Sequence, residues 1–144
     1  PFESNPIGVE EAFPIGGWTR LDSGPDFVQT IQGGGRSKLT LVIAADAHCE
    51  PTEGCLKWAE QNLAQFRKQN VETVVVQEGV GALSKALPAF SGATGSLWRR
   101  LRLSGTPTLF LVDGAGRVRW LYIGFPLNAG RQIRSDLFKA VQGD

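Results

Sequence analysis

Two segments with the pattern of buried strands, joined by one with the pattern of a helix, constrain the fold of this chain more than any other feature. Leu39–Ala45 is a continuous apolar run and Val71–Gln77 is rich in β-branched residues, which is typical of strands in the interior of a sheet. Between them, Cys55–Asn70 carries apolar residues at helical spacing. A strand, a helix and a strand in this order form a right-handed parallel crossover. The sequence therefore predicts an α/β fold whose ligand site lies beyond the carboxyl ends of the strands.

The C-terminal part of the chain predicts an antiparallel hairpin and a last helix. Thr108–Val112 and Arg117–Ile123 have strand patterns, and the segment Asp113–Gly116 between them supplies the glycines that tight turns favour. Asn128 is the candidate N-cap of a final helix that runs to about Val141. Shorter signals predict a strand at Trp18–Leu21 and helices at Asp26–Gln32, Ala82–Leu87 and Ser96–Leu103.

Length and composition indicate one domain. The 144 residues, 42% of them apolar, suffice for a single hydrophobic core. Residues 1–17 are rich in proline and glycine and predict an extended arm, so the domain is expected to span residues 18–144. No apolar run reaches the roughly 20 residues that span a bilayer. The chain begins at Pro1 and contains no methionine, so we expect a processed or trimmed protein whose signal peptide or membrane anchor, if any, lies outside this sequence.

Charge gives no reason to expect nucleic acid as a partner. The formal net charge is +1, and the local cluster of Arg99, Arg100 and Arg102 beside Trp98 is interpreted as a solvated helix face. Nothing in the composition calls for a cofactor, and the oligomeric state stays open.

Chemistry is indicated by Thr106-Pro107, directly before a predicted strand, together with Cys49 and Cys55 upstream. Proline cannot donate a ladder hydrogen bond, and an X-Pro peptide bond is the only kind for which the cis isomer is readily accessible. Two cysteines are too few for a disulfide scaffold. They form a structural disulfide, a redox couple or part of a metal site, and their number does not choose among these.

The stretch Gly105–Val118, together with a strand that ends just before Cys49 and a helix that begins near Cys55, resembles the thioredoxin-like superfamily and in particular its extracytoplasmic TlpA/redoxin branch. The resemblance covers roughly Leu39–Val141. It implies a thioredoxin-like α/β fold, with a central mixed β-sheet flanked by helices on both faces. It also implies thiol-disulfide exchange with a protein partner in the periplasm or another extracytoplasmic compartment.

On this resemblance, Cys49 is the nucleophile and Cys55 the resolving cysteine, beside a cis proline at Pro107 with Thr106 before it. The superfamily's usual spacing is Cys-x-x-Cys, whereas five residues separate the two cysteines here. A helix beginning at Cys55 would place the pair in the field of its N-terminal amides, which favours a thiolate.

Neighbouring ionisable groups are the supporting candidates. His48 could stabilise the Cys49 thiolate or protonate a leaving sulfur, whereas the negative charge of Glu53 raises a nearby thiol pKa. The strand before Cys49 lacks the acid or amide that many members of the superfamily carry, so Asp46 and Glu53 are the candidate proton acceptors.

Two other classes of function stay open. In one, the protein is a non-catalytic scaffold in which a Cys49–Cys55 disulfide closes a small loop. In the other, Cys49, Cys55 and His48 bind copper or another soft metal, or the site handles peroxide.

Overall fold

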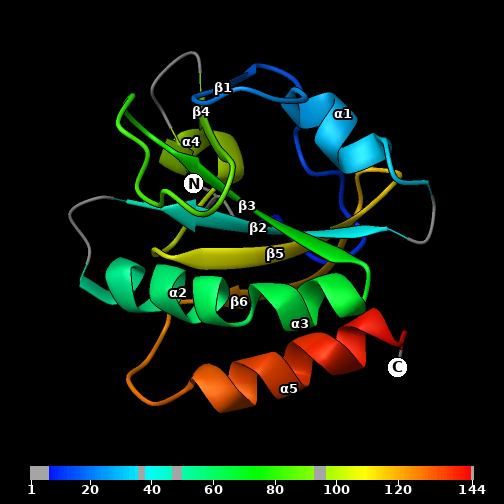
Figure 1. Ribbon diagram of the computed structural model, residues 1–144, viewed down its shortest axis with the longest axis vertical. Helices are drawn as coiled ribbons and strands as arrows, with labels where there is room; N and C mark the ends of the chain where they lie inside the picture. The colour runs from blue at the N-terminus through cyan, green and yellow to red at the C-terminus, as the bar shows by residue number, and fades with distance from the viewer. Residues whose placement is uncertain (1–6, 36–37, 47–49, 93–96, 144) are drawn as a thin grey trace, which may run out of the picture.

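The computed structural model describes residues 7–35, 38–46, 50–92 and 97–143 of the chain. Its centre is a six-stranded mixed sheet in the order β1-β4-β3-β2-β5-β6 (Figure 1). The elements in chain order are β1 (Trp18–Arg20), α1 (Phe27–Gln32), β2 (Leu39–Ala45), α2 (Glu50–Gln61), α3 (Leu63–Lys68), β3 (Val71–Gln77), β4 (Ala89–Gly92), α4 (Leu97–Leu101), β5 (Thr108–Asp113), β6 (Val118–Ile123) and α5 (Gly130–Val141). Among the described residues, no helix has the length and apolar character needed to cross a bilayer.

Strand β2 lies in the interior of the sheet and is paired on both sides. It runs parallel to β3, from Leu39 opposite Val71 to Ala45 opposite Gln77. It runs antiparallel to β5, where Ala44 lies opposite Thr108. The predicted parallel crossover and the predicted β5–β6 hairpin are both confirmed.

Alternating side chains of the central strands build a hydrophobic core on each face of the sheet. Leu41 and Ile43 point to the face covered by α2, α3 and α5, whereas Val42 and Ala44 point to the face of α1 and α4. Figure 1 shows these helices below and above the sheet. The two faces explain why the β2 sequence is apolar at every position from Leu41 to Ala45.

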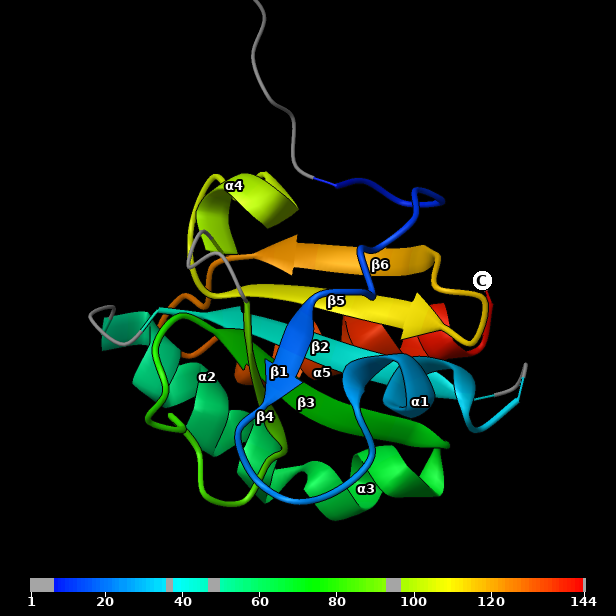
Figure 2. The same ribbon diagram turned by 90° about the horizontal axis from the view of Figure 1, so that it is seen from above.

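The described part of the N-terminal arm, residues 7–17, packs against the face of α1 and α4. It pairs with the start of β6 through hydrogen bonds such as Glu10 N to Val118 O, 2.7 Å, and crosses the sheet to β1 (Figure 2). The guanidinium of Arg100 lies 4.2 Å from the Trp18 ring centroid and donates to the carbonyls of Gly16 and Gly17. Arg100 is thus half-buried against the arm rather than part of a solvated helix face.

Three predicted helical features are wrong. Residues 82–87 contain no helix, because the side-chain amide of Gln77 donates to Gly81 O at 2.8 Å and accepts from Leu83 N at 3.0 Å, which holds an irregular loop. Strand β4, which follows this loop, was not predicted. Asn128 has a φ of 66°, and the residue before α5 is Ala129, which makes no side-chain cap.

The third error concerns the helix after β2. It begins at Glu50, five residues before Cys55, and is interrupted at Asn62. Pro51 is tolerated because amides in the first turn have no partner within a helix, and negative charges at Glu50 and Glu53 are favourable at this end. Cys55 therefore lies in the second turn of α2 and not in the first.

The central position of β5 leads to a stability prediction. Leu111 is fully buried and Leu127 is 91% exposed. We expect Leu111→Ala to lower the free energy of unfolding by about 2–5 kcal/mol, because it leaves a cavity in the core. Leu127→Ala, the matched control, should change it by less than about 0.5 kcal/mol. Urea unfolding followed by circular dichroism measures both, and equal effects would contradict the described packing.

Candidate functional site

The candidate site lies at the carboxyl end of β2, where the chain passes to α2. Asp46 follows the strand and Glu50 is the first helical residue. His48 and Cys49, both predicted site residues, lie outside the described residues. The site is therefore built from the groups that surround this junction.

Pro107 lies beside this junction. The Thr106-Pro107 peptide bond is cis, and Thr108, the next residue, opens β5 opposite Ala44 near the end of β2. Pro107 is buried and Thr106 half-buried. The carbonyl of Pro107 accepts a hydrogen bond from Gly124 N at 2.7 Å, which ties the loop before β5 to the end of β6.

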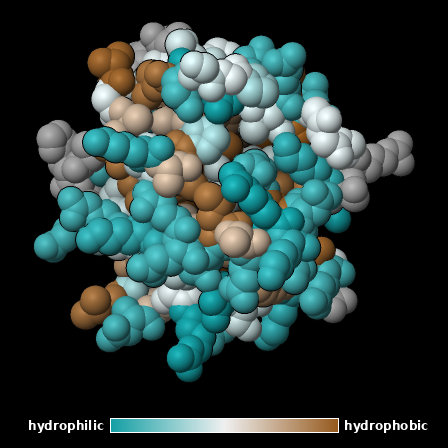
Figure 3. All heavy atoms as spheres, viewed as in Figure 1, coloured by the Kyte–Doolittle hydropathy of each residue, from teal (hydrophilic) through white to brown (hydrophobic). Residues whose placement is uncertain are grey.

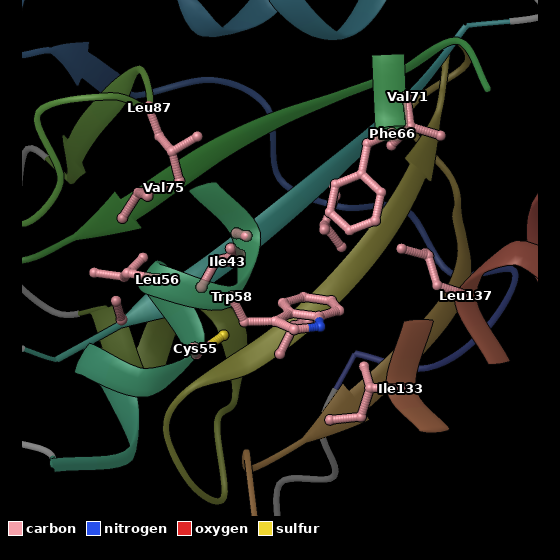
Figure 4. Close-up of a cluster of buried hydrophobic side chains, with 14 of the residues drawn as sticks. Ile43, Cys55, Leu56, Trp58, Phe66, Val71, Val75, Leu87, Ile133 and Leu137 are labelled. Atoms are coloured by element: carbon pink, nitrogen blue, oxygen red, sulfur yellow. The ribbon is translucent and has the colours of Figure 1, made fainter. Parts of the chain in front are cut away.

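Cys55 is a free thiol in the core. Its side chain is 0% exposed, and Figure 4 shows it among the apolar side chains that α2 packs against the sheet, close to Ile43 and Trp58. Burial raises the pKa of the Cys55 thiol to about 12. We expected a helix N-terminus to lower the pKa of Cys55. Cys55 instead lies in the second turn, where desolvation raises its pKa.

Thr52 is a buried polar residue near the junction that the sequence analysis did not single out. It lies in the first turn of α2, is 3% exposed, and its hydroxyl has no hydrogen-bond partner among the described residues. A buried hydroxyl without a partner typically costs about 1–3 kcal/mol. In the sequence, Thr52 could have been found from its position three residues after Cys49. That spacing becomes informative only when the helix is known to begin at Glu50.

Asp46 and Glu53, the candidate proton acceptors, lie in different surroundings. Trp98 Nε1 on α4 donates to Asp46 Oδ2 at 3.4 Å, so the end of β2 is linked to the helix on the far face of the sheet. Glu53 is exposed in the first turn of α2. Trp98 is itself 41% exposed and contributes an aromatic surface beside the junction.

A groove of about 510 Å³ runs between the start of α2 and the β6–α5 loop. Figure 3 shows a mainly hydrophilic face with a hydrophobic protrusion at its lower left, over that loop. Leu127, in the loop, is 91% exposed. The groove is lined by Glu50, Pro51, Gly54, Phe125, Leu127 and Asn128.

Trp58 holds the β6–α5 loop in place. Its indole Nε1 donates to Gly130 O at 3.0 Å, and its ring lies 5.4 Å from that of Phe125. A Cβ atom at Gly130 would come within 2.7 Å of Trp58 Cδ1, so glycine permits this close approach. Trp58 is thus a core residue that supports one wall of the groove, and not part of an exposed partner surface.

The soft-metal alternative receives no support from the described ranges. Within them, no three His, Cys, Asp or Glu side chains gather in a way that could hold a metal ion. His48 and Cys49, on which that alternative depends, lie outside these ranges.

Comparison with known proteins identifies the fold. The structure is similar to a provisionally named thiol:disulfide interchange protein DsbE from Chlorobium tepidum, with a TM-score of 0.67, 15% identity and coverage of 94% of this chain and 99% of the other. It is similar to the exposed lipoprotein thioredoxin of Streptococcus pneumoniae, with a TM-score of 0.63, 14% identity and coverage of 84% and 96%. A thioredoxin-like protein from Porphyromonas gingivalis gives a TM-score of 0.60 at 19% identity, with coverage of 75% and 79%.

No family model and no curated protein sequence matches the chain. The structural similarities, together with the mixed sheet between two helical layers, show that this chain has a thioredoxin-like fold. The fold expected from the sequence is confirmed.

The burial of Cys55 leads to a prediction about its reactivity. In a Cys49→Ser variant, where Cys55 is the one remaining cysteine, native alkylation by iodoacetamide at pH 8 should be on the order of a thousandfold slower than in urea. The reason is that a thiol pKa raised from about 8.5 to about 12 lowers the thiolate fraction by that factor. The native rate should keep rising with pH up to about 12, whereas the rate in urea levels off above about pH 9.5. Rapid native alkylation at pH 8 would contradict the burial.

Proposed function

We propose that this protein exchanges thiols and disulfides with partner proteins, with Cys49 as the attacking thiol. The observation that carries the proposal is the position of buried Pro107 beside the carboxyl end of β2, where the sequence places Cys49 directly before the first residue of α2. Amides at the N-terminus of a helix, here one of twelve residues, favour the thiolate form of a nearby thiol.

The chemistry is a balanced exchange. The Cys49 thiolate attacks one sulfur of a partner disulfide, a new sulfur–sulfur bond forms to Cys49, and the other partner sulfur leaves as a thiolate. His48, next to Cys49 in the chain, is the proposed proton donor to that sulfur, and Asp46 is the proposed acceptor when thiols are deprotonated. The mixed disulfide then needs a second thiol, for which the sequence offers Cys55 and the surroundings offer an external thiol.

The proposed location is extracytoplasmic. Disulfide exchange with folded partners suits an oxidising compartment, and the similar structures include an exposed lipoprotein thioredoxin and a provisionally named DsbE. The groove beside α2, with its apolar Phe125 and Leu127, is the proposed contact for the partner chain.

Reduction of insulin by dithiothreitol tests the function. The wild-type protein should accelerate it, and Cys49→Ser should return the rate to that of dithiothreitol alone, because the attacking sulfur is gone. Circular dichroism and urea unfolding of the variant establish that its fold is retained. Full acceleration by Cys49→Ser would refute the proposal, whereas a wild-type protein that does not accelerate the reaction would favour the scaffold alternative.

Truncation of Leu127 tests the groove. Leu127→Ala removes an exposed apolar side chain from the proposed contact, which should raise KM for a protein disulfide about fivefold, equivalent to about 1 kcal/mol of lost burial. The KM for a small aromatic disulfide should change much less. Val28→Ala, at a 36% exposed position on α1, is the matched control and should leave both values unchanged. Equal effects of the two variants would exclude the groove as a partner contact.

A further inference from the structure

The start of α2 at Glu50 determines which later residue can serve the preceding cysteine. Cys49 is three residues from Thr52 and six from Cys55. Positions three apart on an ideal helix are about 5 Å apart at Cα, and positions six apart about 10 Å. A disulfide needs about 4.4–6.8 Å between Cα atoms. Residues three apart on a helical path are therefore within disulfide range, whereas residues six apart are not.

Thr52 occupies the three-residue position with a polar group that lacks a partner. Its side chain is 3% exposed, on the buried face of α2 that also carries Leu56 and Ala59. Helical side chains lean toward the N-terminus and cover the preceding turn. The Thr52 hydroxyl therefore leans toward the junction with β2, where its Oγ1 has no hydrogen-bond partner among the described residues. Buried hydroxyls normally have a partner, and a thiolate sulfur is an acceptor for a hydroxyl donor.

Cys55 belongs to the core and not to the junction. It lies one turn further along α2 than Thr52, fully buried in the cluster that contains Ile43 and Trp58. Because helical side chains point toward the helix N-terminus, the Cys55 side chain covers the turn around Thr52 and Pro51. An incoming disulfide would have to displace core side chains to reach its sulfur.

We infer that the site exchanges disulfides with one cysteine: Thr52 donates a hydrogen bond to the Cys49 thiolate, Cys55 stays reduced in the core, and an external thiol resolves the mixed disulfide. This inference rests on the proposed function. In the second step, an external thiolate attacks the partner's sulfur in the mixed disulfide. The bond to Cys49 breaks, the Cys49 thiolate is regenerated, and the partner leaves joined to the external thiol, so the protein undergoes no net oxidation.

The redox state of the wild-type protein in a glutathione buffer is the first test. After equilibration, free thiols are alkylated in urea and the products are weighed by mass spectrometry. We expect one glutathione on Cys49 and a free Cys55. An intramolecular Cys49–Cys55 disulfide as the main product would overturn the inference.

Thr52→Cys is the matched gain-of-function variant. It puts a second sulfur at the three-residue position, and we expect it to form an intramolecular disulfide with Cys49 and to lose glutathionylation under the same buffer. If the Thr52→Cys variant carries glutathione on Cys49 as the wild type does, residues 49 and 52 are not within disulfide distance and the inference is wrong.

The role of the hydroxyl is tested through the Cys49 thiol pKa, measured as the pH dependence of iodoacetamide alkylation. Thr52→Val should raise this pKa and lower the alkylation rate at pH 7 about two- to tenfold, the effect of one lost hydrogen bond. Thr52→Ser should restore the wild-type profile. Thr40 and Thr73 also have buried hydroxyls without described partners, but they lie in β2 and β3, so Thr40→Val and Thr73→Val are the controls. The same profile for all three valine variants would refute the role of Thr52.

The two proposals fail in different ways. Insulin reduction that survives Cys49→Ser refutes the proposed function and, with it, this inference. Insulin reduction that requires Cys49 but proceeds through a Cys49–Cys55 disulfide refutes the one-cysteine inference alone.

Discussion

The pairing of β2 on both sides fixes where its carboxyl end and Pro107 lie in the candidate site. Its register with β3 and β5 is set by two hydrophobic cores, because a slip of one residue would move Leu41 and Ile43 to the opposite face of the sheet. With Ala44 held opposite Thr108, Pro107 has to lie near the end of β2. The position of Pro107 beside the carboxyl end of β2 is therefore a consequence of sheet register.

Helix α2 adds a second constraint, which is its rotation about its own axis. Its buried residues, among them Thr52, Leu56 and Ala59, recur at helical spacing and pack on the sheet. The hydrogen bond from Trp58 to Gly130 then joins the helix to the β6–α5 loop. Because packing fixes the rotation, it also places the Thr52 hydroxyl on the buried side of the first turn and the Cys55 sulfur on the buried side of the second.

The sequence predicted the interior strands well because strongly apolar or β-branched runs are typical of strands buried inside a sheet. The bounds of β2 and β3 match the predicted ranges. The loop before β4 was mistaken for a helix because the side-chain hydrogen bonds of Gln77 leave no periodic signal in the sequence. The start of α2 was placed too late because Pro51 and Gly54 resemble loop residues, although Glu50 and Glu53 are typical of a first helical turn. Because of that error, the sequence analysis did not single out Thr52, whose spacing from Cys49 is informative only if Thr52 lies in a helix.

The number of reactive sulfurs decides what such a site can do. Burial raises the pKa of the Cys55 thiol to about 12, so Cys55 is a neutral thiol at pH 7, whereas the thiolate is the form that attacks a disulfide. The hydroxyl of Thr52 can stabilise a neighbouring thiolate but cannot form a disulfide. With Cys49 as the reacting sulfur, the protein cannot store two oxidising equivalents as an internal bond between these positions. Under the proposed one-cysteine exchange, it would pass a disulfide from one partner to another, and the redox poise of the external thiols would determine the direction of exchange.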